Sequence, residues 1–147
     1  MKYAILKKVS PQFFLLLQIL LLLSAAPKSK IEKCLIDHPN QTQACMHKNV
    51  THLTLNSCYS SLQEIKSKHI QETIKDFCFY QVSEFPNLES CLIKSKLFFI
   101  AENHDAATLN CYLQFQENIK KPTCQKIANS LRLPDKQTFL KNHCENL

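Results

Sequence analysis

Apolar side chains recur at steps of three and four residues along most of the chain. One stripe runs through Cys58, Leu62 and Ile65, and another through Ile70 and Ile74. This spacing places side chains on one face of an α-helix, whereas the period-two alternation typical of a strand is scarce. The pattern predicts an all-α protein built from short amphipathic helices.

Three prolines indicate where helices begin. Pro86, Pro122 and Pro134 each precede an amphipathic stretch, and proline is favoured in the first turn of a helix. The helix after Pro86 is expected to continue through Phe98 and Phe99. Its broad apolar face predicts that it is the most buried helix of the protein.

Six of the eight cysteines form three pairs with one period. Cys58 to Cys78, Cys91 to Cys111 and Cys124 to Cys144 each enclose nineteen residues, and the motif recurs every 33 positions. When a helix of about ten residues is followed by an antiparallel helix of the same length, the start of the first and the end of the second lie within disulfide reach. We therefore favour three disulfide-stapled helical hairpins, one in each 33-residue repeat. The same spacing also allows Cys78–Cys91 and Cys111–Cys124, across the connections.

The segment before the first repeat resembles a degenerate fourth unit. Cys45 precedes Cys58 by thirteen positions, as Cys78 precedes Cys91, but the available partner of Cys45 is Cys34. We expect a Cys34–Cys45 disulfide to close a shorter loop. Residues 27–57 would then form an N-terminal cap unit, and residues 58–147 three helical-hairpin repeats, together in one compact domain.

Residues 1–26 have the three parts of a secretory signal peptide. Lysines precede an apolar run from Phe13 to Leu23, and small residues follow it. The run is too short to cross a bilayer, which needs about 20 residues. We expect cleavage of residues 1–26 and a secreted, extracellular protein without a membrane span. Acceptor sequences for N-linked glycans at Asn40 and Asn49 indicate a glycoprotein.

Composition excludes several classes of function. Three lysines of the expected signal peptide supply half of the formal net charge of +6, and the rest is dispersed, so nucleic-acid binding is not indicated. The chain has no glycine, which excludes Walker, Rossmann and EF-hand loops. No Cys-x-x-Cys motif occurs, so disulfides explain the cysteines better than a metal site does. We expect no cofactor, no metal and no enzymatic activity.

One pair of residues resembles a catalytic motif. His104-Asp105 resembles the His-Asp pair of the secreted phospholipases A2, which are also helical and rich in cysteine. That family holds a calcium ion in a glycine-rich loop, which this chain lacks. We therefore interpret Asp105 as the cap of the following helix and His104 as a loop residue.

Two functions remain. A rigid, stapled scaffold without a catalytic motif favours a non-enzymatic, toxin-like effector that binds an extracellular protein target. In its signal, cysteines and short helices the chain resembles rapidly diverging secreted proteins of invertebrates, and no motif assigns a family. The alternative is a carrier for a small apolar ligand. Its pocket would be lined by aromatic residues of the central unit, namely Phe98, Phe99, Tyr112 and Phe115.

Overall fold

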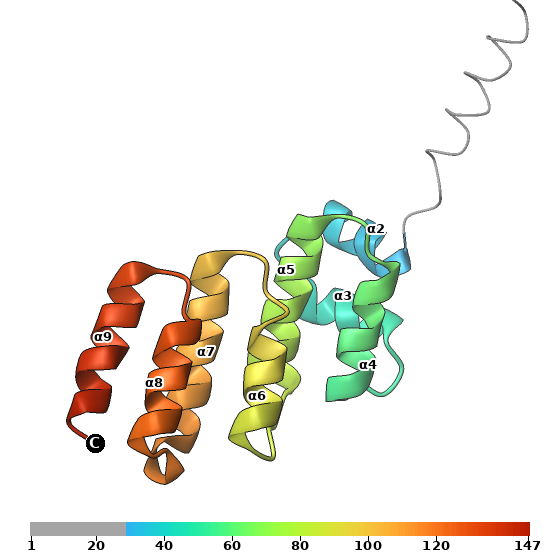
Figure 1. Cartoon of the computed structure of the whole chain (residues 1–147). Helices are drawn as coiled ribbons and strands as arrows, with labels where there is room; N and C mark the ends of the chain where they lie inside the picture. The colour runs from blue at the N-terminus through green and yellow to red at the C-terminus, as the bar shows by residue number, and fades with distance from the viewer. Residues whose placement is uncertain (1–28) are drawn as a thin grey trace, which may run out of the picture.

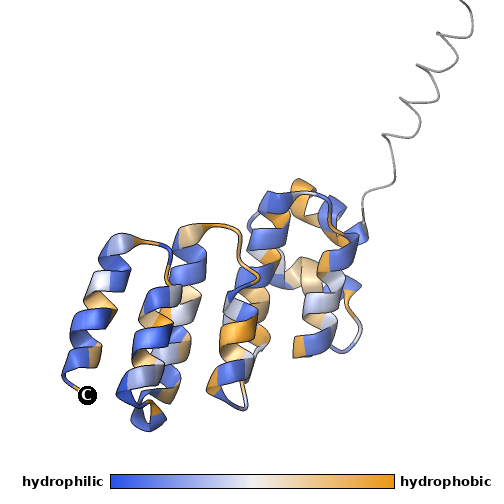
Figure 2. Cartoon of the chain, in the orientation of Figure 1, coloured by the Kyte–Doolittle hydropathy of each residue, from blue (hydrophilic) through white to orange (hydrophobic). Residues whose placement is uncertain are grey.

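The computed structural model describes residues 29–147, so the expected signal peptide lies outside the described residues (Figure 1). This part of the chain contains eight α-helices and no strand. Their bounds are α2 (Lys30–Asp37), α3 (Thr42–Asn49), α4 (Leu55–Ser60), α5 (Lys68–Phe77), α6 (Leu88–Ser95), α7 (Ala101–Phe115), α8 (Lys121–Ser130) and α9 (Pro134–Glu145). Figure 2 shows hydrophilic and hydrophobic residues along the same helices, as expected of amphipathic elements. The prediction of an all-α protein is confirmed.

Side-chain caps decide several helix starts. Thr54 and Ser57 form a capping box before α4, and Ser67 accepts a hydrogen bond from the backbone N–H of Ile70 at the start of α5. Pro122 and Pro134 lie in the first turns of α8 and α9, as predicted. Each cap satisfies N–H groups that have no partner inside their own helix.

The central helix differs from the prediction. Asn87 accepts a hydrogen bond from the backbone N–H of Ser90, so α6 begins after Asn87, and Pro86 precedes the helix instead of opening it. The helix ends at Ser95, and Phe98 and Phe99 lie in the loop before α7. The prediction that this helix runs through both phenylalanines is therefore wrong. The backbone N–H of Phe99 donates a hydrogen bond to the carboxylate of Glu72, so it does not continue the helical hydrogen bonding of α6.

Four disulfides staple the chain. They are Cys34–Cys45, Cys58–Cys78, Cys91–Cys111 and Cys124–Cys144, each with Cα atoms 5.6 to 5.7 Å apart. This is the pairing that the sequence favoured, and the rival pairing across the connections is not formed. Three of the bonds join successive helices, namely α2 to α3, α6 to α7 and α8 to α9, and Cys58–Cys78 joins α4 to the turn that directly follows α5.

The core is divided among neighbouring clusters along the row of helices. One cluster joins α2 and α3 to α4 and α5, a second surrounds Phe98, and a third lies between α7, α8 and α9. Buried residues recur at 33-residue intervals, as at Ile65, Phe98 and Leu131. Within residues 29–147, no helix combines the length and the apolar character that a membrane span requires.

Three buried carboxylates connect neighbouring parts of the fold. Glu32, Glu72 and Asp105 are exposed to only 3%, 4% and 1%. Glu32 accepts the backbone N–H of Ser67, Glu72 that of Phe99, and Asp105 those of Arg132 and Leu133; the distances are 2.8 to 3.0 Å. These N–H groups precede α5, α7 and α9, where a helix start needs acceptors. We call Glu32, Glu72 and Asp105 the backbone-binding carboxylates.

Candidate functional site

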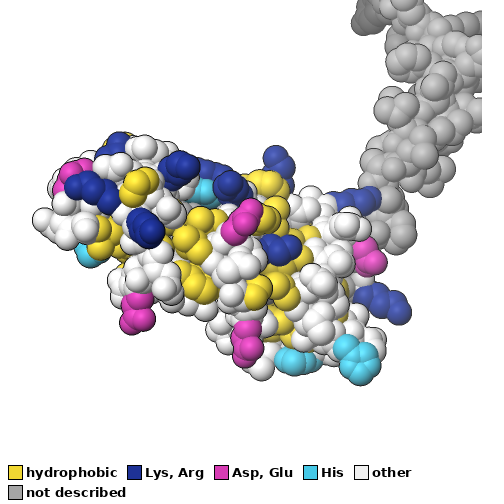
Figure 3. Space-filling view, turned by 60° about the horizontal axis from the view of Figure 1, so that its bottom comes forward, with side chains coloured by type: hydrophobic (Ala, Val, Ile, Leu, Met, Phe, Trp, Pro, Cys, Tyr) yellow, Lys and Arg dark blue, Asp and Glu magenta, His cyan; other side chains and the backbone are white. Residues whose placement is uncertain are grey.

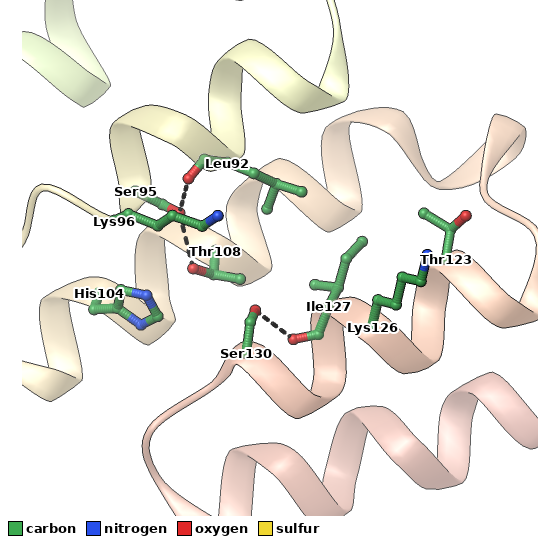
Figure 4. A pocket seen from close by; sticks show the side chains of 9 residues that line it. All are labelled: Leu92, Ser95, Lys96, His104, Thr108, Thr123, Lys126, Ile127 and Ser130. Carbon is green, nitrogen blue, oxygen red and sulfur yellow. Dashed lines mark hydrogen bonds between the residues drawn. The ribbon is translucent and has the colours of Figure 1, made fainter.

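A pocket of about 230 Å³ opens where α6, α7 and α8 meet. We call it the α6–α8 pocket (Figure 4). Its lining comes from α6 and the residue after it, from the first half of α7, and from one side of α8. The lining residues are Leu92, Ser95, Lys96, His104, Thr108, Thr123, Lys126, Ile127 and Ser130.

His104 and Asp105 form a buried pair at this pocket. Both lie inside α7 and are exposed to only 3% and 1%, so the interpretation of His104 as a loop residue and Asp105 as a helix cap is wrong. The Nδ1 atom of His104 lies 2.7 Å from Oδ1 of Asp105. Because an ionised carboxylate only accepts hydrogen bonds, Nδ1 carries the proton. The other ring nitrogen, Nε2, has no hydrogen-bond partner within residues 29–147.

Asp105 is held in its ionised form. Burial by itself would raise the pKa of its carboxyl, but the hydrogen bonds from His104 and from the backbone N–H groups of Arg132 and Leu133 outweigh that effect and lower the pKa. The carboxylate fixes the orientation of the imidazole and the start of α9 together. Asp105 is thus a structural anchor beneath the pocket wall.

Three of the four hydroxyl groups that line the pocket already donate their protons. Ser95 Oγ donates to the carbonyl oxygen of Leu92, Thr108 Oγ1 donates to Ser95 Oγ at 3.0 Å, and Ser130 Oγ donates to the carbonyl oxygen of Ile127 (Figure 4). No hydroxyl in residues 29–147 is hydrogen-bonded to His104. The described part of the chain therefore lacks the bonded hydroxyl and imidazole that activate a nucleophile.

Two lysines lie at the mouth of the pocket. Lys96 and Lys126 are exposed, and neither forms an ion pair with another residue in the range 29–147. The segment of α8 contains no acidic residue. Figure 3 shows lysine and arginine side chains gathered along one edge of the molecule, above a band of hydrophobic side chains. The mouth of the pocket is positively charged.

The four aromatic residues predicted to line a carrier pocket lie in different surroundings. Phe98 is buried, with its ring 5.8 Å from that of Phe79, whereas Phe99 is 55% exposed beneath the ammonium group of Lys75. Tyr112 is buried in the cluster of α7, α8 and α9, and the half-buried Phe115 packs against two clusters. None of the four lines the α6–α8 pocket.

The two candidate glycosylation sites differ in accessibility. Asn40 is exposed in the turn between α2 and α3. Asn49 is half-buried at the end of α3, and its Nδ2 atom donates to the carbonyl oxygen of Cys45 at 2.8 Å. In residues 29–147, no three histidine, cysteine or acidic side chains are placed to hold a metal ion.

A signal for the structural role of Asp105 was present in the sequence. Asp105 follows Glu72 by 33 positions, the period of the cysteines. Two acidic residues at equivalent positions of successive predicted hairpins indicate a shared structural role. The equivalent position also places Asp105 inside a helix. The lysines at the mouth had no such signal, because α6 and α8 meet only in the folded protein.

Comparison with known proteins adds no assignment. No family model, no curated protein sequence and no solved structure matches this chain.

Proposed function

We propose that the protein is a non-enzymatic, extracellular binding protein, a toxin-like effector that acts on a protein target. It binds this target through the face formed by α6 and α8. The observation that carries the proposal is that Lys96 and Lys126 are exposed and form no ion pair within residues 29–147, on a scaffold stapled by disulfides.

The disulfides support the extracellular setting. Four disulfides and no free cysteine in the described residues are typical of proteins that work in oxidising compartments. A scaffold held in this way loses little conformational freedom when it binds, which favours affinity.

The lysines indicate the chemistry of the partner. Charged groups at an interface accelerate encounter and select partners of the opposite sign. Lys96 and Lys126 have no ion-pair partner in residues 29–147, so an acidic surface can engage them without displacing an existing pair. The target is therefore a protein with an acidic patch.

Charge reversal tests the proposed face. Purified acidic extracellular proteins are screened by biolayer interferometry, and a saturable partner is then measured with the double variant Lys96→Glu/Lys126→Glu. We expect the Kd to rise by about tenfold or more, and wild-type binding to weaken with added salt. The control is Lys136→Glu/Lys141→Glu, two exposed lysines on α9. Equal loss in both variants, or no loss in the first, would contradict the proposed face.

The carrier of a small apolar ligand remains the second candidate. The α6–α8 pocket favours it, because Leu92 and Ile127 give the pocket an apolar wall. A carrier of this kind would bind neutral ligands as well as charged ones. The relative affinities of a neutral probe and charged probes, described in the next subsection, test for such a carrier.

A further inference from the structure

The mouth and the floor of the α6–α8 pocket have different chemistry. Lys96 and Lys126 are exposed at the mouth, while Ser95, Thr108 and His104 are buried at the floor, each exposed to 3% or less. A ligand that enters the pocket therefore meets two ammonium groups at its outer end. Its inner end meets hydroxyl oxygens and an imidazole.

The floor offers acceptors for hydrogen bonds. The hydroxyl protons of Ser95 and Thr108 are already donated, at 2.9 and 3.0 Å, and each oxygen keeps lone-pair capacity. The Nδ1–H of His104 is donated to Asp105, which leaves Nε2 as the ring nitrogen available to a ligand. A ligand group that donates a hydrogen bond can therefore pair with the acceptors at the floor. A purely apolar ligand group would leave these acceptors unpaired.

The pocket also has an apolar wall. Leu92 and Ile127 lie on facing helices, α6 and α8, and both line the cavity (Figure 4). Its volume of about 230 Å³ suits a small molecule. Exposed lysines, an apolar wall and buried hydrogen-bond acceptors therefore line one cavity.

We propose that the α6–α8 pocket binds a small organic anion that carries a hydroxyl or similar donor at the end opposite its charge. The anionic head is a carboxylate or a phosphate held by Lys96 and Lys126. The apolar body contacts Leu92 and Ile127, and the donor bonds to the oxygens and imidazole at the floor. This site goes beyond protein binding and differs from an apolar carrier, because it requires a charge.

Matched aromatic probes test the proposal by two-dimensional NMR titration of the 15N-labelled, disulfide-bonded protein. The probes are 4-hydroxybenzoate, 4-hydroxyphenyl phosphate, benzoate, 4-hydroxybenzyl alcohol and inorganic phosphate. We expect saturable shifts at the amides of Ser95, Thr108 and Ile127 with at least one of the two hydroxylated anions. Benzoate, the neutral alcohol and inorganic phosphate should each bind about tenfold or more weakly, since each lacks at least one of the three features. The better of the two anions identifies the preferred head group.

The lysine variants replace exposed residues and so avoid the risk of unfolding. Lys96→Gln and Lys126→Gln should each raise the Kd by about tenfold, the value of one charge-assisted hydrogen bond, and Lys136→Gln on α9 should leave it unchanged. His104→Gln should selectively remove the advantage of the hydroxylated probe over benzoate. Glutamine stands 33 positions to either side of His104, at Gln71 and Gln137. Both donate to backbone carbonyl oxygens.

Three results would overturn the anion site. They are absence of saturable shifts with either hydroxylated anion, equal affinity for the neutral alcohol, and equal loss of binding in Lys136→Gln and Lys126→Gln. Equal affinity for the neutral alcohol would instead support the apolar carrier. A negative titration leaves the protein-binding proposal standing, because that proposal is tested by charge reversal against a protein partner.

Discussion

At the scale of single residues, Asp105 is an acceptor shared by three donors. Its carboxylate accepts hydrogen bonds from the His104 ring and from two backbone N–H groups that precede α9. Removing the charge would leave these buried donors with weaker or no acceptors, which costs more than losing an exposed hydrogen bond.

We therefore predict that Asp105→Asn lowers the free energy of unfolding by about 3 kcal/mol at pH 7. Urea denaturation followed by circular dichroism measures the change. The matched control is Asp135→Asn, the same substitution at an exposed position in the first turn of α9. It should change stability by less than about 0.5 kcal/mol. Similar effects of the two substitutions would contradict the structural role of Asp105.

The pH dependence follows from the lowered pKa of Asp105. When the folded pKa lies below the unfolded one, the ionised form stabilises the protein above the unfolded pKa, and this contribution is lost as the pH falls through the folded value. The unfolded pKa of aspartate is about 4. The stability difference between wild type and Asp105→Asn should therefore be constant near neutral pH and shrink below about pH 4.

At the scale of elements, the disulfides are protected to different degrees. Cys34, on α2, is partly exposed, whereas both cysteines of each later pair are fully buried at 0% exposure. A reductant attacks a sulfur atom directly, so access controls the rate of reduction.

We predict that mild reduction opens Cys34–Cys45 before the other three bonds. Brief treatment with dithiothreitol, alkylation and peptide mass spectrometry should find label on Cys34 and Cys45 first. The same treatment in concentrated urea is the control, because unfolding exposes all four bonds and should remove the difference. Early labelling of Cys91 or Cys111 under native conditions would show that the central hairpin opens more readily than its burial implies.

At the scale of the whole molecule, α2 and α3 take no part in the proposed binding face, which lies on α6 and α8. Figure 1 shows α2 and α3 at one end of the row of helices and α9 at the other. The division of the chain into 33-residue units stays a prediction, supported by the equal spacing of three disulfides and by the backbone N–H groups that the carboxylates bind.

Glycan attachment should follow accessibility at the cap unit. In protein secreted from insect cells, we predict that Asn40→Gln removes one glycan and that Asn49→Gln removes none, because the Nδ2 atom of Asn49 is bound to the carbonyl oxygen of Cys45. Intact mass spectrometry before and after glycosidase treatment measures both. A glycan lost only in Asn49→Gln would reverse the assignment. Asn40→Gln should also leave binding at α6 and α8 unchanged.

Local patterns predicted much of the architecture and little of the site. Apolar spacing indicated helices, and the prolines before α8 and α9 marked their starts. The end of α6 was missed, because the N–H groups of Phe99 and Ile100 bind Glu72, 27 and 28 positions away. The burial of His104 and Asp105 was missed for the same reason, since Asp105 binds Arg132 and Leu133 at similar separations.

The sequence by itself determined the all-α class and favoured the disulfide pairing that the structure has. Both depend on short-range geometry, since helical periodicity and the rise per residue decide which side chains share a level. Only the tertiary structure decided which acids are buried and which residues share the α6–α8 pocket. These features arise where separate hairpins pack together, and the positions of a packed neighbour are not encoded in any one segment of the chain.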